Sequence, residues 1–382
     1  IEVNEEDVDY ATTNWTYANG NIDEGVTFSE VCTLEGYTFV PDDNFEQALI
    51  DLGYDDVLDN YVVTDSISGV TSMTISNYQN EEDYVSDLTG IGGFTALTTL
   101  NVSYNSLTTL DMSANTALTY LQCYGNNLTS INVSANTALV ELQCGGNNLT
   151  SLDITNNTAL TILGAQRNSF TSLDLSNNVL LVTLFLKEGD LTSLDVSNNT
   201  ALGRIECQFN SLETLDFSNN TALYSMKCYN NQLTYLNMKN GVTDQLTTFN
   251  ATNNFLYCIE VNAEDVGYAT ENWTFANGNI DEGVGFSVVC GPEGYTYVPD
   301  DNFEQALIDL GYDDTLDDFV LTENISGVTE LNVDSKEISD LMGIEDFTAL
   351  TILNCHSNQL TSLYVSANTG LTILNCHSNQ LT

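Results

Sequence analysis

Four of the chain's six basic residues lie in four consecutive sequence segments that share one pattern. Aromatic residues stand beside them, and a tyrosine has an equivalent place earlier in the chain. Lysine and arginine donate charge-assisted hydrogen bonds, and aromatic rings stack on apolar or sugar surfaces. The combination predicts a binding site for an acidic or hydroxylated ligand. Its candidate residues are Tyr124, Arg167, Phe185, Lys187, Arg204, Phe209, Lys227 and Tyr229.

A second interpretation of the same basic residues is equally open. Glu141, Glu188 and Glu206 lie in the same segments, so the cations could neutralise these acids as exposed pairs across neighbouring strands. In that case the basic residues belong to the scaffold and need no ligand.

Metal-binding patterns are weaker. His356 and His377 stand 21 residues apart, but both belong to a copied phrase, "LNCHSNQ", which explains them without a metal. The acids around Asp55 have copies at Asp313, Asp314 and Asp317, which are candidate calcium ligands. They lack EF-hand spacing, and a solvated acidic loop is the alternative. We expect no cofactor, with calcium as the one open possibility.

No catalytic motif stands out. Paired carboxylates are uninformative in a chain with 54 acidic residues, no serine or cysteine nucleophile has a plausible histidine nearby, and there is no glycine-rich phosphate loop. We therefore expect a protein that is not an enzyme.

The charge balance excludes some partners. A net charge of −48 argues against nucleic acid and anionic lipid, since both require a basic surface. The hydrophobic content of 42% is that of a folded protein. No apolar run approaches the length that crosses a bilayer, so we expect no membrane insertion.

The elements that carry these residues repeat every 21 residues from Leu97 to about Leu236, as in "LTYLQCYGNNLTSINVSANTA" and "LVELQCGGNNLTSLDITNNTA". One such coil cannot enclose a core, so each must bury its leucines against the next, which gives a solenoid. Asparagines recur in two rows, for example Asn126 with Asn147 and Asn136 with Asn157. Their buried amides are expected to bond the backbone at the turns.

The pattern L-x-x-L-x-C-x-x-N-x-L resembles the leucine-rich repeats of secreted bacterial proteins of the Bacteroidetes type, which have 21-residue, cysteine-containing repeats in tandem modules. This resemblance implies a leucine-rich-repeat solenoid: a curved β-solenoid, mainly β, with short helical amino-terminal caps. It also implies that recognition occurs on the concave face formed by the strands.

Six cysteines fall at one repeat position, where valine, alanine and leucine also occur. Strands stack about 4.8 Å apart, whereas a disulfide requires Cβ atoms about 3.8 Å apart. We predict free, buried thiols at this position, and a metal site built from adjacent thiols is the less favoured alternative. The six are Cys123, Cys144, Cys207, Cys228, Cys355 and Cys376.

Two further segments interrupt the repeats. Cys258 and Cys290 bracket an aromatic segment with Trp273, Phe275 and Phe286, which we interpret as a carboxy-terminal cap closed by a disulfide. A disulfide implies an oxidising compartment. "YVPDDNFEQALIDLGYDD" predicts a helix that starts after Asp300 or Asp301, buries Phe303, Ala306, Leu307 and Leu310, and stops at Gly311. The same helix is expected near Tyr37, with Phe45, Ala48, Leu49 and Leu52 buried. The resemblance makes it an amino-terminal cap.

The order of these segments predicts a window on a tandem array. Residues 1–32 copy 259–290 without a cysteine before Ile1, so Cys32 is expected to be unpaired through truncation. The predicted domains are a truncated carboxy-terminal cap (1–34), an amino-terminal cap (35–94), a solenoid (95–257), a disulfide-closed cap (258–290), a second amino-terminal cap (291–346) and the first repeats of the next module (347–382).

The resemblance implies an extracellular or cell-surface, non-enzymatic binding or adhesion protein that recognises a protein or glycan through the concave strand face. The alternative is a structural stalk, filament or surface-layer element that associates with copies of itself. Short matches to the O-glycosylation signal of Bacteroidetes make Ser66 and Thr315 weak candidate acceptors.

Overall fold

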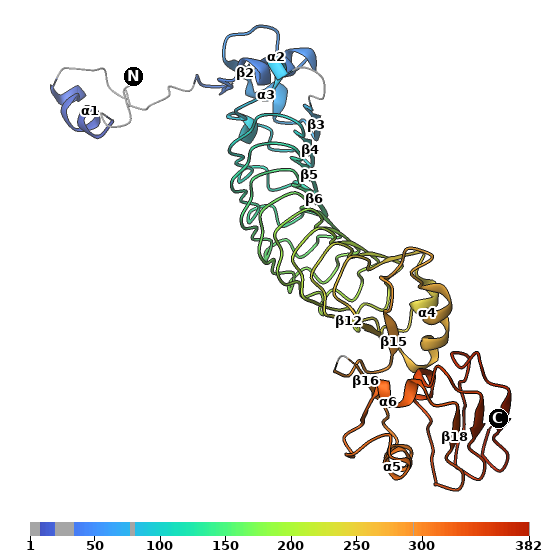
Figure 1. Cartoon of the computed structure of the whole chain (residues 1–382). Helices are drawn as coiled ribbons and strands as arrows, with labels where there is room; N and C mark the ends of the chain where they lie inside the picture. The colour runs from blue at the N-terminus through green and yellow to red at the C-terminus, as the bar shows by residue number, and fades with distance from the viewer. Residues whose placement is uncertain (1–7, 20–33, 77–80, 293, 382) are drawn as a thin grey trace. The chain divides into compact units, whose positions relative to one another are not determined.

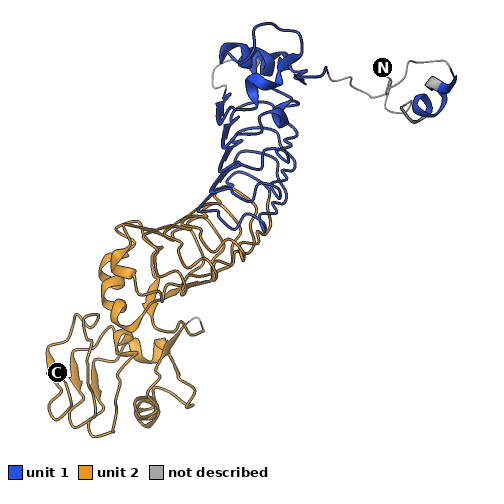
Figure 2. Cartoon of the chain, turned by 180° about the vertical axis from the view of Figure 1, so that it is seen from behind, with its two compact units in different colours: residues 1–169 blue, residues 170–382 orange. Residues whose placement is uncertain are grey.

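The structure, a computed structural model, describes residues 8–19, 34–76, 81–292 and 294–381. The chain divides into two compact units, residues 1–169 and 170–382 (Figure 2), and each is described by itself. Cys32 lies outside the described residues, so its predicted unpaired state is untested.

The first unit begins with helical and antiparallel elements and continues as a stack of short strands (Figure 1). Its helices are α1 (Val8–Asn14), η2 (Tyr17–Asn19), α2 (Asp43–Asp51), α3 (Thr64–Ile67), η3 (Glu81–Asp83) and η4 (Ile91–Gly93). Its strands are β1 (Tyr37–Phe39), β2 (Tyr61–Val63), β3 (Ser72–Thr74), β4 (Thr99–Asn101), β5 (Tyr120–Gln122), β6 (Glu141–Gln143) and β7 (Ile162–Gly164).

The strands of the repeats stack in parallel, one per coil. Leu121 of β5 lies opposite Leu100 of β4 on one side and Leu142 of β6 on the other. All three leucines are fully buried. The predicted 21-residue period therefore places each central leucine directly on the next. The residues that flank these leucines are half-buried, and we call the surface that the flanking residues of successive strands form the strand face.

Buried asparagines close the turn after each strand. The side chain of Asn126 donates to the carbonyls of Val102 and Cys123, and its oxygen accepts the N–H of Leu107. Asn136, in the second row, donates to the carbonyls of Met112 and Asn115. The predicted role of both rows is confirmed, because these bonds satisfy main-chain groups that a three-residue strand leaves unpaired.

The second unit carries more coils and two further segments. Its helices are η5 (Thr243–Gln245), η6 (Ala263–Asp265), α4 (Val266–Asn272), α5 (Asp301–Leu310), α6 (Thr322–Ser326) and η7 (Ile344–Asp346). Its strands are β8 (Thr183–Phe185), β9 (Arg204–Glu206), β10 (Thr214–Asp216), β11 (Ser225–Lys227), β12 (Tyr235–Asn237), β13 (Thr248–Asn250), β14 (Cys258–Glu260), β15 (Gly285–Ser287), β16 (Tyr295–Tyr297), β17 (Phe319–Leu321), β18 (Glu330–Asn332), β19 (Ile352–Asn354) and β20 (Ile373–Asn375).

Parallel pairing also dominates this unit. β8, β9, β11 and β13 are neighbours in that order, and β10, β12, β14 and β15 form a second sheet. β18, β19 and β20 form a third, whereas β16 and β17 pair antiparallel. Met226 of β11 lies opposite Phe249 of β13, so the two-residue insertion before Ala251 leaves the register intact.

Cys258 and Cys290 form a disulfide, with their Cα atoms 5.7 Å apart, which is the pairing expected from the sequence. Trp273 of the enclosed segment is buried, stacks on Phe249 at 3.9 Å and meets Phe286 edge-on. Phe275, the third aromatic residue of the segment, is 61% exposed. The aromatic core of this segment consists of Trp273 with Phe249 and Phe286.

Helices α2 and α5 form where the sequence predicts them, but the buried face differs in part. Asp300 caps α5 by accepting the N–H groups of Asn302 and Phe303, and Gly311 ends it with φ of 80°. Leu310 and Leu52 are exposed, against expectation, while Glu304 and Glu46 are fully buried. The acid takes the inner position because main-chain N–H groups of the following loop bond its carboxylate.

Candidate functional site

Three cations converge on one carboxylate on the strand face of the second unit. Glu206 of β9, whose side chain is 6% exposed, lies 2.6 Å from Arg204, 3.3 Å from Lys227 and 3.6 Å from Lys187. Lys227 of β11 is the register partner of Glu206, which explains the contact. We call Lys187, Arg204, Lys227 and Glu206 the basic patch.

The carboxylate of Glu206 remains ionised in this setting. Burial raises its pKa, but the hydrogen bond from Arg204 and the charge of Lys227 outweigh burial, so the pKa lies below its ordinary value. The three cations are between 34% and 41% exposed. The patch therefore keeps two positive charges in excess, within reach of solvent.

Aromatic rings flank the basic patch. The guanidinium of Arg204 lies 5.0 Å from the ring centre of Phe185. Phe209 and Tyr229 pack edge to face at 5.3 Å, and Phe209 is 48% exposed. Such a surface offers stacking area beside hydrogen-bond donors.

Polar atoms without partners lie among these residues. Nε of Arg204 and Oε1 of Gln208 are buried, and neither has a hydrogen-bond partner within the described part of the chain. Unpaired buried polar groups are costly. They are not restricted to this patch, because the oxygen of the structural Asn136 is also buried without a partner among the described residues.

The other two predicted site residues meet in the first unit. Nη1 of Arg167 lies 3.2 Å from the hydroxyl of Tyr124, whose ring packs against Tyr104 at 5.3 Å. The predicted residues thus fall into two groups, one in each unit. Arg167 has a left-handed φ of 56° at the turn position where Gly146 stands one coil earlier.

Both interpretations of the basic residues find support in this geometry. The pair between Lys227 and Glu206 is a neutralising cross-strand pair of the kind in the second interpretation. Arg204, however, lies on the same strand as Glu206, and the carboxylate is nearly buried where the interpretation expected exposed pairs. The ion pairs leave unused charge and donors, because each lysine has three N–H groups and the patch has one carboxylate. The sequence did not reveal that all three cations share one acid.

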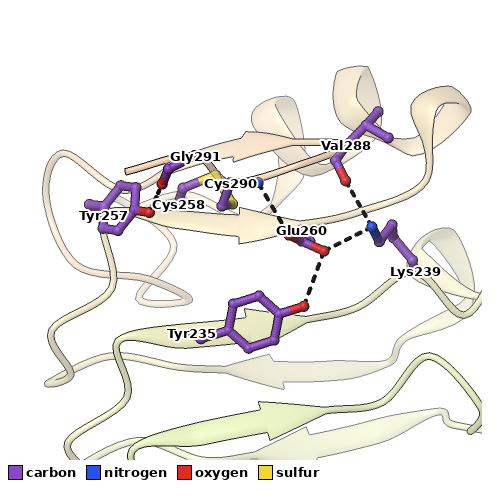
Figure 3. The surroundings of a disulfide bond; sticks show 8 residues. All are labelled: Tyr235, Lys239, Tyr257, Cys258, Glu260, Val288, Cys290 and Gly291. Atoms are coloured by element: carbon purple, nitrogen blue, oxygen red, sulfur yellow. Dashed lines mark hydrogen bonds and ion pairs between the residues drawn. A yellow bond between two sulfur atoms is a disulfide. The ribbon is translucent and has the colours of Figure 1, made fainter. Parts of the chain in front are cut away.

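A second ionic cluster, around Lys239, was not predicted (Figure 3). Its ammonium lies 2.8 Å from Glu260 and donates to the carbonyl of Val288 at 3.0 Å. Glu260 also accepts from the hydroxyl of Tyr235 and from the N–H of Cys290. Burial and the charge of Glu260 raise the pKa of Tyr235 to about 12. These contacts hold the disulfide-closed segment against β12, so their role is structural. The signal in the sequence was Lys239, a cation outside the repeated pattern.

The repeat cysteines are free, as predicted. Five are buried and Cys376 is half-buried, because it follows β20, the last described strand. Burial raises the pKa of Cys144 and of Cys207 to about 12 and that of Cys355 to about 11. Thiols held in the protonated form are poor nucleophiles and poor metal ligands.

The two histidines show no metal-ligand geometry. The rings of His356 and His377 stack in parallel at 4.6 Å, and each Nδ1 lies beside the hydroxyl of the next serine. Among the described residues, no group of three or more His, Cys, Asp or Glu side chains is arranged to hold a metal ion. Ser66 and Thr315 are exposed, and the hydroxyl of Thr315 donates to Asp314.

Solved structures resemble this chain, although no protein-family model and no curated protein matches it. The functional domain of InlJ from Listeria monocytogenes, described as including a cysteine ladder, superposes with a TM-score of 0.52 at 24% identity, over 91% of this chain and 72% of that one. The fold is a leucine-rich-repeat solenoid. The internalin InlF of the same species gives a TM-score of 0.45 at 18% identity, over 90% of this chain and 91% of that one. A leucine-rich-repeat protein of Leptospira interrogans gives 0.41 at 18%, over 77% and 69%.

Of the predicted site residues, Phe185, Arg204 and Lys227 lie on strands β8, β9 and β11. The other five lie in the segments just after the strands of their coils: Tyr124, Arg167, Lys187, Phe209 and Tyr229. None of the helices in the described residues is both long and apolar enough to cross a membrane.

Proposed function

We propose that this protein is an extracellular, non-enzymatic leucine-rich-repeat binding or adhesion protein that recognises an acidic protein or glycan through its strand face. The single observation that carries the proposal is the basic patch: three half-exposed cations around one buried carboxylate in a chain of net charge −48. An acidic ligand would pair with the excess charge, and Phe209 and Tyr229 would supply stacking area.

The tandem organisation belongs to the same proposal. In it, residues 35–94 and 291–346 are amino-terminal caps, 95–257 is a solenoid, 258–290 is its closing cap, and 1–34 and 347–382 belong to neighbouring modules. The two helices α2 and α5, capped alike by Asp42 and Asp300, support the equivalence of the two caps. Repetition of modules would multiply binding surfaces along one chain.

The proposed location is the cell exterior. The Cys258–Cys290 disulfide supports it, because such bonds persist in oxidising compartments. The resemblance to secreted Bacteroidetes proteins points the same way. In this proposal no nucleic acid and no membrane lipid is a partner, since the surface charge repels both.

A binding screen of the whole chain against acidic and neutral glycans and peptides tests this function. The variant Lys187→Ser/Lys227→Ser should lose at least about tenfold in affinity for the acidic ligand found, since each exposed charge contributes on the order of 1 kcal/mol. Lys336→Ser is the matched control, because Lys336 pairs only with the exposed Asp309 in α5. It should bind as the wild type does.

Two outcomes would contradict the proposed binding function. Failure of every acidic ligand to bind, together with concentration-dependent assembly in sedimentation, would favour the structural alternative, a stalk or surface-layer element that contacts copies of itself. An equal loss of affinity in the patch variant and in Lys336→Ser would indicate a general charge effect. It would contradict a specific role of the basic patch in binding.

A further inference from the structure

Each helical cap contains a glutamate that is fully buried on its helix. Glu46 of α2 and Glu304 of α5 occupy the same helix position, directly after a buried phenylalanine, and neither is exposed to solvent. A buried carboxylate is costly unless it is paired. An apolar side chain would be more stable at this buried position, so the presence of a glutamate there needs an explanation.

Only one of the two carboxylate oxygens is satisfied in each copy. Oε1 of Glu46 accepts the N–H groups of Asp59 and Tyr61, both at 3.0 Å. Oε1 of Glu304 accepts the N–H of Asp317 at 2.9 Å. These bonds hold the carboxylate against the loop that follows the helix. Oε2 is buried in both copies and has no hydrogen-bond partner among the residues that the structure describes.

The loop supplies a second unpartnered oxygen in each copy. Oδ2 of Asp55 and Oδ2 of Asp313 are buried, and neither has a hydrogen-bond partner in the described ranges of the chain. Burial raises the pKa of Glu46 and of Glu304, and the charges of Asp55 and Asp313 raise these two pKa values further. The two unpartnered oxygens of each cap therefore belong to acids that repel one another.

No basic side chain of the described residues forms an ion pair that would relieve this repulsion. Among the described residues, no ion pair involves Glu46, Asp55, Glu304 or Asp313. A third acid adds to the charge at each place: besides burial, the charge of Asp59 raises the pKa of Asp55, and the charge of Asp317 raises that of Asp313. One proton could neutralise one acid of each group, whereas a divalent cation would compensate two.

We propose that each cap holds a calcium ion, ligated by the unpartnered oxygens of Glu46 and Asp55 in one unit and of Glu304 and Asp313 in the other. Calcium takes six to eight oxygen ligands, from carboxylates, main-chain carbonyls and water. Each proposed site has two carboxylates, from residues nine positions apart, whereas an EF-hand loop supplies more oxygen ligands. The affinity should therefore be that of extracellular modules, with a dissociation constant of about 0.1 to 1 mM.

The experiment uses the whole chain and terbium, a luminescent calcium substitute. Tyr54 and Tyr312 directly precede the two aspartates, so they are placed to sensitise terbium bound there. We expect about two sites per chain, displaced by calcium, in physiological sodium chloride that suppresses diffuse binding to the acidic surface. Calcium should also raise the melting temperature.

Substitutions locate the sites. Glu304→Gln keeps the acceptor for the N–H of Asp317, and it should leave about one site. Glu46→Gln/Glu304→Gln should leave none, and Asp55→Asn/Asp313→Asn should reproduce the loss from the loop side. The control Asp51→Asn/Asp309→Asn removes exposed acids from the same two helices and should keep both sites. Circular dichroism reports whether each variant is folded.

Two results would overturn the proposal. One is full terbium binding by folded Glu46→Gln/Glu304→Gln or Asp55→Asn/Asp313→Asn. The other is a wild-type chain that binds no calcium at 10 mM, together with a Glu46→Gln/Glu304→Gln variant that is more stable than the wild type without calcium. That result would mean that the acids are neutralised by protonation and not by a metal ion.

Discussion

The carboxylate of Glu260 accepts the backbone N–H of Cys290 at 3.2 Å, so the cysteine that closes the disulfide is also held by the strand that carries its partner (Figure 3). Glu260 lies on β14 two residues after Cys258. Lys239 then connects this carboxylate to the carbonyl of Val288. The covalent and ionic contacts therefore act on the same few residues.

Loss of the disulfide should destabilise this segment. The bond closes a separation of 32 residues, and the chain-entropy model assigns such a loop about 3 to 4 kcal/mol. We expect Cys258→Ser/Cys290→Ser to be cut by protease between these positions at lower denaturant than the wild type. Cys355→Ala, which alters a free thiol, is the control. Equal resistance of the double variant would show that the ionic contacts suffice.

Removal of Lys239 should cost more than removal of an exposed lysine. Glu260 is 8% exposed and Lys239 29%, so Lys239→Ala leaves a nearly buried carboxylate without its cation. A fully buried pair costs about 3 to 5 kcal/mol to break, and partial exposure reduces this to about 2. Lys336→Ala, in an exposed pair, should cost about 1 kcal/mol or less. Urea denaturation of both variants compares them, and equal values would refute the structural role of Lys239.

The asparagine row should be far more sensitive than its neighbours. Asn147 donates to the carbonyls of Cys123 and Cys144 and accepts the N–H of Leu128. Asn147→Leu leaves these buried groups unpaired, at about 1 to 3 kcal/mol each. Asn148 is exposed, and Asn148→Ala should change stability by less than about 0.5 kcal/mol. Thermal melting measures the difference, and similar melting temperatures would contradict the assignment.

Much of this fold could be predicted from the sequence, because the 21-residue repeat determines which residues of neighbouring coils contact one another. The spacing of Leu121 and Leu142 predicts their contact, and the turn amides follow from it. The buried faces of the helices were less predictable. Glu304 is buried and Leu310 is exposed, because the carboxylate of Glu304 accepts the N–H of Asp317, which lies thirteen residues later in a loop. The spacing of apolar residues along a helix does not predict a hydrogen bond from a loop outside that helix.

The candidate site was predictable as a set of residues but not as an arrangement. The repeat position of Lys227 places it beside Glu206, as register requires. That Lys187 and Arg204 turn toward the same carboxylate depends on side-chain conformation, which spacing does not determine. Lys239 was missed because it lies outside the repeated positions on which the prediction was based.

Acidity should stabilise the region around Glu345. Burial, with the charge of Asp346, raises the pKa of Glu345 from 4.5 to about 7. The protonated form favours the folded state, so the free energy of unfolding should fall as pH rises from about 4.5 to about 7 and change little beyond. Glu345→Gln should remove this dependence. Matching pH profiles for the variant and the wild type would contradict it.

The affinity of Glu206→Gln for an acidic ligand tests the central claim most directly. In the wild type Glu206 competes with the ligand for Lys187, Arg204 and Lys227, so its neutral form frees all three cations. A unit charge at about 4 Å corresponds to about 1 kcal/mol even with the full screening of bulk water, and we predict binding at least roughly fivefold tighter, with a steeper dependence on salt. Unchanged or weaker binding by the folded variant would contradict the claim that the basic patch receives the ligand.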